Sequence, residues 1–550
     1  MLDCVPPFAN SLRPSRTIRT LISIVSGHTL ILASSAATEG LRLDTVPSSS
    51  RFVQSLRKNL NREHVAALES CLDCGQCGSA CAWYLATGNP QLHPRRKTGF
   101  LRRIQRRYLR PWSPLLEKAG LLRPPSEAAL REEMASFWKC TTCGRCTMAC
   151  PLGISNRKLV RLGRRAFVEA GFARENPVLR QIEEGSRGQR HSFGVPRERT
   201  QLRIAFHFQA SGVQVPLDVE GAEYLLLCTA VGNTRIPHLG IKIPMLLNAA
   251  GVSYTASRRI LDTGTEAEFV IVHEELSRAM LLDVEEEALR LGVSTLLVPE
   301  CGCDTRTFFQ DAGNILGRPL RVGVRTLDSL LLEQLRSNRL PFQAVRDRLT
   351  LHDPCKVTRL SGLGEESRQI LSLIASDFVE MTPNREHNYC CNGGSGPLRL
   401  PENDGLRRDV SVLKARQIRA TGAKRVATPC AVCMLTLADI AEHHQLAPDG
   451  ERMSFLLFEI VFEAVDEALA ARGERDRFRL PRALRDRSEA FLAAHGVEGL
   501  AAENLRDPRI AVQALAWLRE DGQVGRLVQT DHRAAALLER WERQVAEIAG

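Results

Sequence analysis

The spacing of the cysteines constrains this chain more than any other feature of its sequence. The chain has 17 cysteines in 550 residues, and all of them except Cys4 fall into defined groups. Disulfide frameworks are typical of small secreted domains that cannot build a hydrophobic core, whereas a chain of this length should form about three domains or more. The grouping therefore indicates metal chemistry rather than disulfide bonds.

Two cysteine runs repeat the pattern C-x2-C-x2-C-x3-C, over residues 71–81 and 140–150. Three closely spaced thiolates can bind three corners of a cubane [4Fe–4S] cluster, and in two-cluster ferredoxins the fourth cysteine of each run binds the other cluster. Zinc sites more often use pairs of ligands, which disfavours zinc. The sequence thus predicts two cubane [4Fe–4S] clusters, one held by Cys71, Cys74, Cys77 and Cys150 and the other by Cys140, Cys143, Cys146 and Cys81.

The segments around both runs have a helical composition. The 58 residues between Cys81 and Cys140 exceed the spacing in small ferredoxins, which favours a helical ferredoxin domain over residues 59–184 that conducts electrons between its clusters. Residues 1–58 are predicted to be an N-terminal extension. Within them, Thr20–Ala37 has the outline of a secretory signal, but its polar residues make an extension the preferred interpretation. No stretch has the roughly 20 consecutive apolar residues that a membrane-spanning helix needs.

A basic segment follows the first run. Residues 95–110 contain eight lysines and arginines and no acidic residue, and their spacing predicts an amphipathic helix. Its charged face is either simply solvated or docks against anionic lipid or an acidic partner subunit. Nucleic acid is disfavoured because no recognition motif accompanies the charge.

Beyond residue 200, apolar β-branched runs alternate with helical stretches, which predicts α/β layers around a mostly parallel sheet. The candidate strands are Tyr224–Cys228, Phe269–Val272, Ser294–Pro299, Leu349–His352 and Arg425–Thr428. The segments 294–303 and 424–433 both run from a strand through proline into a cysteine pair, which suggests a duplicated unit. The predicted fold class is α+α/β: the helical module, a linker at 185–200, two halves at 201–340 and 341–455, and a helical C-terminal extension at 456–550 whose role the sequence does not indicate.

The second half carries its own cysteine set, Cys355, the adjacent pair Cys390 and Cys391, and then Cys430 and Cys433. The motifs that contain them, LHDPC, NYCCNGGSG and TPCAVC, resemble the CCG domain of heterodisulfide reductases. The resemblance implies that these five cysteines hold a noncubane [4Fe–4S] cluster, at which a disulfide is cleaved in two one-electron steps. A structural metal or buried free thiols are the alternative, which five cysteines at this spacing disfavour.

Two departures from that family pattern bear on the site. The family usually continues the cysteine pair with glycine, where this chain has Asn392; cluster binding stays plausible, and the approach of the substrate is left open. In the first half, Cys228, Cys301 and Cys303 occupy the outer positions of the pattern, but no cysteine pair falls near residues 261–266. We therefore expect no second noncubane cluster there, and Cys301 and Cys303 either line the site or are remnants.

Histidines near the second-half cysteines are candidate proton donors. His387, preceded by Glu386, could protonate a leaving thiolate, or it could merely bond the backbone around the cluster. His352 is placed similarly beside Cys355.

A narrower resemblance comes from segment 377–391 and the spacing of the ferredoxin runs, which are similar to the DsrK-type subunits of the membrane complex linked to dissimilatory sulfite reductase. It covers roughly residues 66–455. It implies a cytochrome b-type membrane partner that exchanges electrons with quinone, a DsrC-like protein whose disulfide or trisulfide is the substrate, and a cytoplasmic location, peripheral on the inner membrane.

The leading hypothesis is a catalytic electron-transfer subunit that couples quinone-linked electron flow to the reduction or formation of a protein disulfide. The direction of electron flow is set by the cluster potentials, which depend on hydrogen bonds and solvation. The alternative is a non-catalytic relay subunit of a flavin-dependent dehydrogenase for glycolate, lactate or glycerol 3-phosphate, whose iron–sulfur subunits share this cysteine layout. The chain has no Rossmann glycine fingerprint, so the flavin would come from a partner. A purely structural metal protein is a third possibility.

Overall fold

The structure, a computed structural model, describes residues 46–448, 450–480 and 508–549. The chain divides into two compact units, Met1–Val46 and Pro47–Gly550, and the elements below belong to the second. Most of the predicted N-terminal extension, with its signal-like segment and Cys4, lies outside the described residues.

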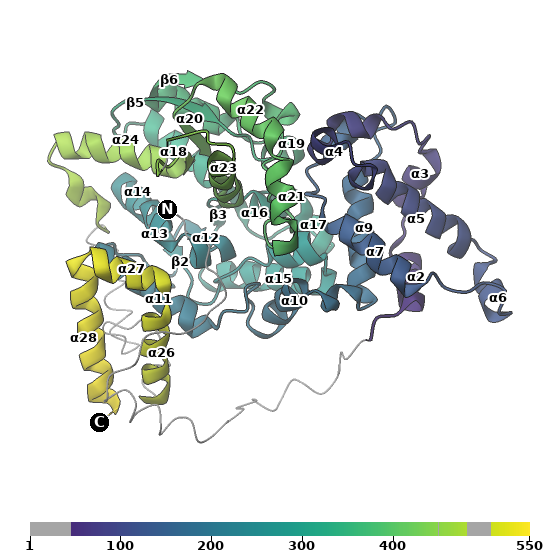
Figure 1. The fold of residues 1–550 in the computed structure, drawn as a ribbon. Coiled ribbons are helices and arrows are strands. Elements are labelled where there is room, and N and C mark those ends of the chain that lie inside the picture. The colour runs from purple at the N-terminus through teal and green to yellow at the C-terminus, as the bar shows by residue number, and fades with distance from the viewer. Residues whose placement is uncertain (1–45, 449, 481–507, 550) are drawn as a thin grey trace. The chain divides into compact units, whose positions relative to one another are not determined.

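The first part of this unit is helical (Figure 1). A buried aromatic core that includes Phe52, Phe100, Phe137 and Phe167 holds the helices together. Phe52 belongs to α2, Ser49–Asn59, so a helix inside the predicted extension packs into the ferredoxin module. The other helices of this part are α3 Arg62–Ser70, α4 Ala82–Thr87, α5 Pro94–Tyr108, α6 Ser113–Lys118, α7 Glu127–Trp138, α8 Arg145–Met148, α9 Asn156–Glu169 and α10 Pro177–Gly188.

Two four-stranded parallel sheets form the centre of the rest. The first runs in the order β2-β1-β3-β4 and the second in the order β6-β5-β7-β8, so the two sheets have the same topology. This agrees with the predicted mixed α+α/β class. The strands are β1 Tyr224–Leu226, β2 Tyr254–Ala256, β3 Thr295–Val298, β4 Gly323–Thr326, β5 Val345–Leu351, β6 Ala375–Val379, β7 Arg425–Thr428 and β8 Ser454–Leu456.

Helices connect the strands, as the crossovers of parallel strands require. In the first half these are α12 Ala230–Arg235, α13 Pro237–Gly240, α14 Lys242–Ala250, α15 Glu274–Arg290, α16 Gly302–Arg306, α17 Ala312–Leu316 and α18 Leu327–Arg336. In the second half they are α19 Thr358–Ser361, α20 Glu365–Ile374, α21 Asp404–Asp409, α22 Val412–Thr421, α23 Ala431–His443 and α24 Leu457–Ala471. One buried apolar cluster extends through both halves and includes α14, α18, α20 and α24.

Three expectations about local structure were wrong. The segment Phe269–Val272 is not a strand: Ala267–Ile271 forms a π-helical turn, and its carbonyl groups accept hydrogen bonds from Arg164 and Trp138 instead of from a sheet. The predicted linker is helical at both ends, because α10 continues to Gly188 and α11 spans Arg197–Ser211. The second half continues past residue 455, since β8 and α24 pack on its sheet.

The described C-terminal helices, α26 Pro508–Glu520, α27 Gly522–Thr530 and α28 His532–Ala549, pack against α11. Trp541 meets Phe206 edge to face, and Arg203 donates to Asp521 at 2.5 Å. Among the described residues, no helix has both the length and the apolar character to cross a membrane.

Candidate iron–sulfur sites

The first group of thiols forms what we call the outer site, a cavity lined by Cys71, Cys74, Cys77 and Cys150. It takes three cysteines from the first run and one from the second, which is the predicted combination. Cys74 is exposed, and Leu72 beside it keeps 74% of its surface accessible. The outer site therefore lies at the surface of the module.

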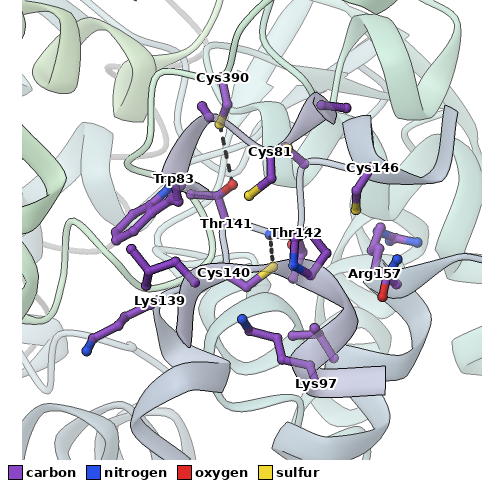
Figure 2. Close-up of a pocket in the computed structure, with 18 of the residues that line it drawn as sticks. Cys81, Trp83, Lys97, Lys139, Cys140, Thr141, Thr142, Cys146, Arg157 and Cys390 are labelled. Atoms are coloured by element: carbon purple, nitrogen blue, oxygen red, sulfur yellow. Dashed lines mark hydrogen bonds between the residues drawn. The ribbon is translucent and has the colours of Figure 1, made fainter. Parts of the chain in front are cut away.

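The second group forms the inner site, a cavity lined by Cys81, Cys140, Cys143 and Cys146. Figure 2 shows three of these side chains around the cavity, with Cys390 approaching it from the side of Thr141. In both runs the residue before the second cysteine and the glycine after it have positive φ, at Asp73 and Gly75 and again at Thr142 and Gly144. These left-handed turns curl each run so that its first three thiols face one cavity.

The donor sets of both cavities fit a cubane cluster. Each offers four thiols, and every cysteine of the described residues is free of a disulfide bond. Four cysteine thiolates are the ligand set of a [4Fe–4S] cluster.

The five cysteines of the second half converge at the carboxyl ends of β5 and β7, where ligand sites of parallel sheets are found. Cys355 follows β5, Cys430 precedes α23, and Cys433 lies in its first turn. All five are buried, and the sulfur atoms of Cys391 and Cys433 lie 3.3 Å apart. We call this group the five-cysteine site. A buried group of five thiols offers the donor set of an iron–sulfur cluster.

Asn392 occupies its position in the way a glycine would. It is buried, its φ is 69°, and its backbone N–H donates to the sulfur of Cys390 at 3.4 Å. Asparagine tolerates the left-handed region better than other non-glycine residues. The departure from the family pattern therefore leaves the loop conformation intact.

The inner site and the five-cysteine site share a wall. The thiol of Cys390 donates to the hydroxyl of Thr141 at 3.5 Å, and Cys390 lines the inner cavity together with Cys143. On the same wall, the hydroxyl groups of Thr142 and Ser395 lie 2.7 Å apart. Short contacts of this kind connect the two sets of thiols.

Two arginines fix this wall. The guanidinium of Arg164 is fully buried and donates to the carbonyl groups of Cys140 at 2.6 Å and of Ser395 at 2.7 Å, so it joins the two sites. Arg359 donates to the carbonyl of Cys143 at 3.0 Å and also to that of Asn388. Both arginines act through backbone atoms and were not predicted from the sequence.

Buried polar side chains surround the five-cysteine site. The ammonium group of Lys414 donates to Asn388 at 2.7 Å, and burial lowers its pKa to about 7, although nearby acidic groups and thiols oppose this. His352 lies near Cys391 and Cys433, with the three ligand atoms within 4.8 Å of one another, and burial lowers its pKa. Burial acts to raise the pKa of Asp353, but its hydrogen bonds from Arg368 outweigh this and hold the pKa below its usual value.

The structure does not bring His387 to the five-cysteine site. Its side chain is 63% exposed and lies 3.5 Å from Glu386, while only its backbone carbonyl takes part in the wall by accepting from Arg145. His352 is the imidazole that lies among the thiols. His387 sits on a 3₁₀ turn outside the buried loop, and sequence distance alone could not separate the two positions.

The basic segment forms α5 as predicted, but four carboxylates of the module balance half of its eight positive charges. Six of its seven arginines lie within ion-pair distance of Glu69, Asp73, Glu132 and Glu133. These acidic residues come from α3, α7 and the first cysteine run, so the sequence of α5 alone overstates the charge of this face.

In the first half, Cys228 and the pair Cys301 and Cys303 follow β1 and β3, the strands equivalent in topology to β5 and β7. Cys303 is partly exposed and Cys301 is buried.

Comparison with known proteins assigns families to both parts of the chain. Residues 67–154 match the 4Fe-4S dicluster domain, and residues 349–438 match CCG, the cysteine-rich domain. The chain is 26% identical to an Hdr-like menaquinol oxidoreductase iron–sulfur subunit 2 of Archaeoglobus fulgidus, over 69% of this chain and 78% of the relative. It is 27% identical to one subunit of the dihydromethanophenazine:CoB–CoM heterodisulfide reductase of Methanosarcina acetivorans, over 70% and 91%. It is also 21% identical to the EtfAB:quinone oxidoreductase of Syntrophomonas wolfei, over 72% and 60%.

These matches define an iron–sulfur electron-transfer subunit of the oxidoreductase type, built from a dicluster domain and a cysteine-rich domain. Over about 70% of its length, the chain is similar to heterodisulfide reductase-like iron–sulfur subunits. The predicted resemblance to heterodisulfide reductase iron–sulfur subunits is confirmed, and the narrower resemblance to DsrK-type subunits stays a prediction.

Proposed function

We propose that this chain carries electrons between a membrane-bound, quinone-reacting cytochrome b-type subunit and the five-cysteine site, where a protein disulfide or trisulfide is reduced or formed. Two cubane clusters at the outer and inner sites and one noncubane cluster at the five-cysteine site are its proposed cofactors. The relatives named as menaquinol and quinone oxidoreductases support the membrane partner. A peripheral position on the cytoplasmic side of the inner membrane follows from the same proposal.

The inner site and the five-cysteine site share a wall, and this arrangement is the main support for the proposal. Cys390 belongs to the five-cysteine set and lines the inner cavity as well. When bound, the clusters would supply one-electron carriers at the outer, inner and five-cysteine sites in turn. The protein's part is to hold the thiols in place, which Arg164 and Arg359 do through the carbonyl groups of Cys140 and Cys143.

The buried surroundings of the five-cysteine site suit the cleavage of a sulfur–sulfur bond. Each thiolate that leaves needs a proton, and His352 lies among the thiols, where an imidazole can hold and deliver one. The ammonium group of Lys414 lies behind the same loop through Asn388 and adds donors that favour negative charge at the sulfur atoms. A small DsrC-like protein that presents a cysteine-bearing arm is the proposed substrate.

A second candidate is a relay subunit without catalysis of its own, and the similarity to the EtfAB:quinone oxidoreductase favours it. Its electrons would enter from a flavin on a partner and leave to quinone, with no disulfide consumed.

The two candidates differ in what oxidises the reduced protein. The purified holoprotein, reduced anaerobically and freed of reductant, should convert the disulfide of an oxidised DsrC-like protein to two thiols, as counted by alkylation and mass spectrometry. Cys433→Ala should lose this conversion by at least about tenfold, because one thiol of the five-cysteine set is gone. If the wild type leaves the disulfide intact but accepts electrons from a reduced electron-transferring flavoprotein, the relay candidate holds instead.

A further inference from the structure

The cysteine pair of the first half lies against the five-cysteine site. The backbone N–H of Ala431, next to Cys430, donates to the carbonyl of Glu300 at 2.7 Å, which joins the two cysteine-bearing loops. A Cβ atom placed on Gly302 would lie 3.4 Å from the sulfur of Cys430. The glycine between Cys301 and Cys303 therefore packs directly on a thiol of the five-cysteine set.

The two thiols of the pair have different surroundings. Cys301 is buried, and its sulfur accepts from the backbone N–H of Asp304 at 3.5 Å. Cys303 keeps part of its surface accessible. A hydrogen bond from Cys301 lowers the pKa of Cys303 to about 7, with a further contribution from Lys356, while Cys301 has a raised pKa. Cys303 therefore suits the role of the attacking nucleophile, and Cys301 suits the role of the resolving thiol.

Two further buried side chains, those of Lys356 and Asp304, lie near the cysteine pair. The ammonium group of Lys356 is buried between the halves, where it donates to the hydroxyl of Ser395 at 2.7 Å. The carboxyl of Asp304 is also buried and accepts from the hydroxyl of Thr263 at 2.7 Å. Burial raises the pKa of Asp304 to about 8, so the group keeps its proton at neutral pH.

We propose that Cys303 and Cys301 form a dithiol site that exchanges with the disulfide of the substrate beside the five-cysteine site. The sulfur of Cys303, as thiolate, attacks one sulfur of a disulfide R–S–S–R′, and a bond from Cys303 to R–S forms as the S–S bond breaks. The R′–S group leaves with the electron pair and takes up a proton. Cys301 then attacks the sulfur of Cys303 and releases R–S, which also takes up a proton. The pair is oxidised to a disulfide, and the substrate is reduced to two thiols.

This exchange rests on the proposed function in one respect. Two electrons must return the oxidised pair to its dithiol form, and the iron–sulfur clusters would provide them. The exchange itself needs no other reductant, because the two electrons and both protons come from the cysteines. It also gives the first half a role that does not require a second cluster.

The test uses the cluster-loaded protein in a Cys4→Ser background, with its cysteine pair reduced by a monothiol that is then removed and with its clusters left oxidised. The probe is 5,5′-dithiobis(2-nitrobenzoate), whose reaction releases a coloured thiol. A dithiol site predicts fast release of about two thiols per chain. Cys303→Ser should slow this release at least about tenfold, because the attacking thiolate is lost.

Cys301→Ser should stop after about one released thiol and retain the probe as a mixed disulfide on Cys303, visible as a mass increase of the peptide. Cys228→Ser is the matched control, since its thiol lies in the same half and burial raises its pKa to about 12; its release should equal that of the wild type. Iron content measured on every variant shows whether it has folded and kept its clusters.

Equal release from the wild type and Cys303→Ser, or no adduct in Cys301→Ser, would overturn the dithiol site. The same variants distinguish a failure of the dithiol site from a failure of the proposed function. If Cys303→Ser still reduces the DsrC-like disulfide at the rate of the wild type, the dithiol site fails while the function stands. If the dithiol reacts as predicted but the reduced wild type does not turn over that disulfide, the function fails while the thiol site stands.

Discussion

Arg164 has no acidic partner among its hydrogen-bond acceptors in the described part of the chain, and its role follows from the carbonyl groups that it binds. Its guanidinium donates to Phe137, Cys140, Phe269 and Ser395, which come from the dicluster module and from both halves of the α/β part. Buried carbonyl groups that lose a charged donor are costly. We therefore regard Arg164 as the residue that keeps the inner site aligned with the five-cysteine site.

Arg164→Met should lower the free energy of unfolding by on the order of 3 kcal/mol and should reduce iron binding at the inner site first. Arg165→Met is the matched control, because Arg165 neighbours it on α9 and pairs with Glu169 near the surface, where such a pair contributes about 0–1 kcal/mol. Melting temperature and iron content, measured on both variants, check the prediction. Equal losses in the two variants would contradict the proposed role.

The site residues divide into those that the sequence could predict and those that it could not. The cysteines could be predicted, because cluster chemistry demands a particular residue type at a particular spacing. Arg164, Arg359 and Lys414 could not, since they act from distant elements through backbone atoms or an amide. The two candidate histidines could not be separated for a related reason, because proximity in sequence did not show that His352 lies among the thiols and His387 is exposed.

At the scale of elements, central strands were predicted more readily than edge strands. The central strands β1, β3, β5 and β7 coincide with or overlap predicted segments, whereas the edge strands β2, β4, β6 and β8 were not predicted. Phe269–Val272 was misread because an apolar run of this length fits a strand and a buried turn equally well. The contact of α11 with the C-terminal helices depends on residues some 300 positions apart, which no local pattern reveals.

The packing of α11 on the first half of the α/β part is sensitive to pH. His207 on α11 is buried, and burial lowers its pKa from 6.5 to about 4, with His238 adding to the shift. Between these values the unfolded chain binds a proton that the folded chain does not, so stability falls as the pH decreases from 6.5 to 4. This shift in the pKa of His207 corresponds to a loss of about 3 kcal/mol in the free energy of unfolding at low pH.

His207→Gln should remove this pH dependence from the unfolding of α11, whatever its effect at neutral pH. Hydrogen exchange of the backbone amides, corrected for intrinsic rates at each pH, measures the slope. His532→Gln, at the first residue of α28, should leave the slope unchanged. An unchanged slope in His207→Gln would show that other groups cause the acid sensitivity.

At the scale of the unit formed by residues 47–550, the three groups of thiols form a series. The outer site reaches the surface, the inner site lies behind it, and the five-cysteine site shares a wall with the inner site. The interlocked runs join the first two, and the loops around Cys390 and Ser395 join the last two. The same topology in both sheets places the dithiol pair of the first half beside this series.

The central claim is that the five-cysteine site holds a cluster of its own. Iron and sulfide counts, with EPR spectra recorded after thiol–disulfide oxidation of the anaerobically purified protein, test it most directly. We expect about twelve irons per chain and an oxidised-state signal in the wild type, and about eight irons with no such signal in Cys391→Ala. About eight irons in the wild type, or a signal that survives in Cys391→Ala, would contradict the claim and leave a two-cluster relay.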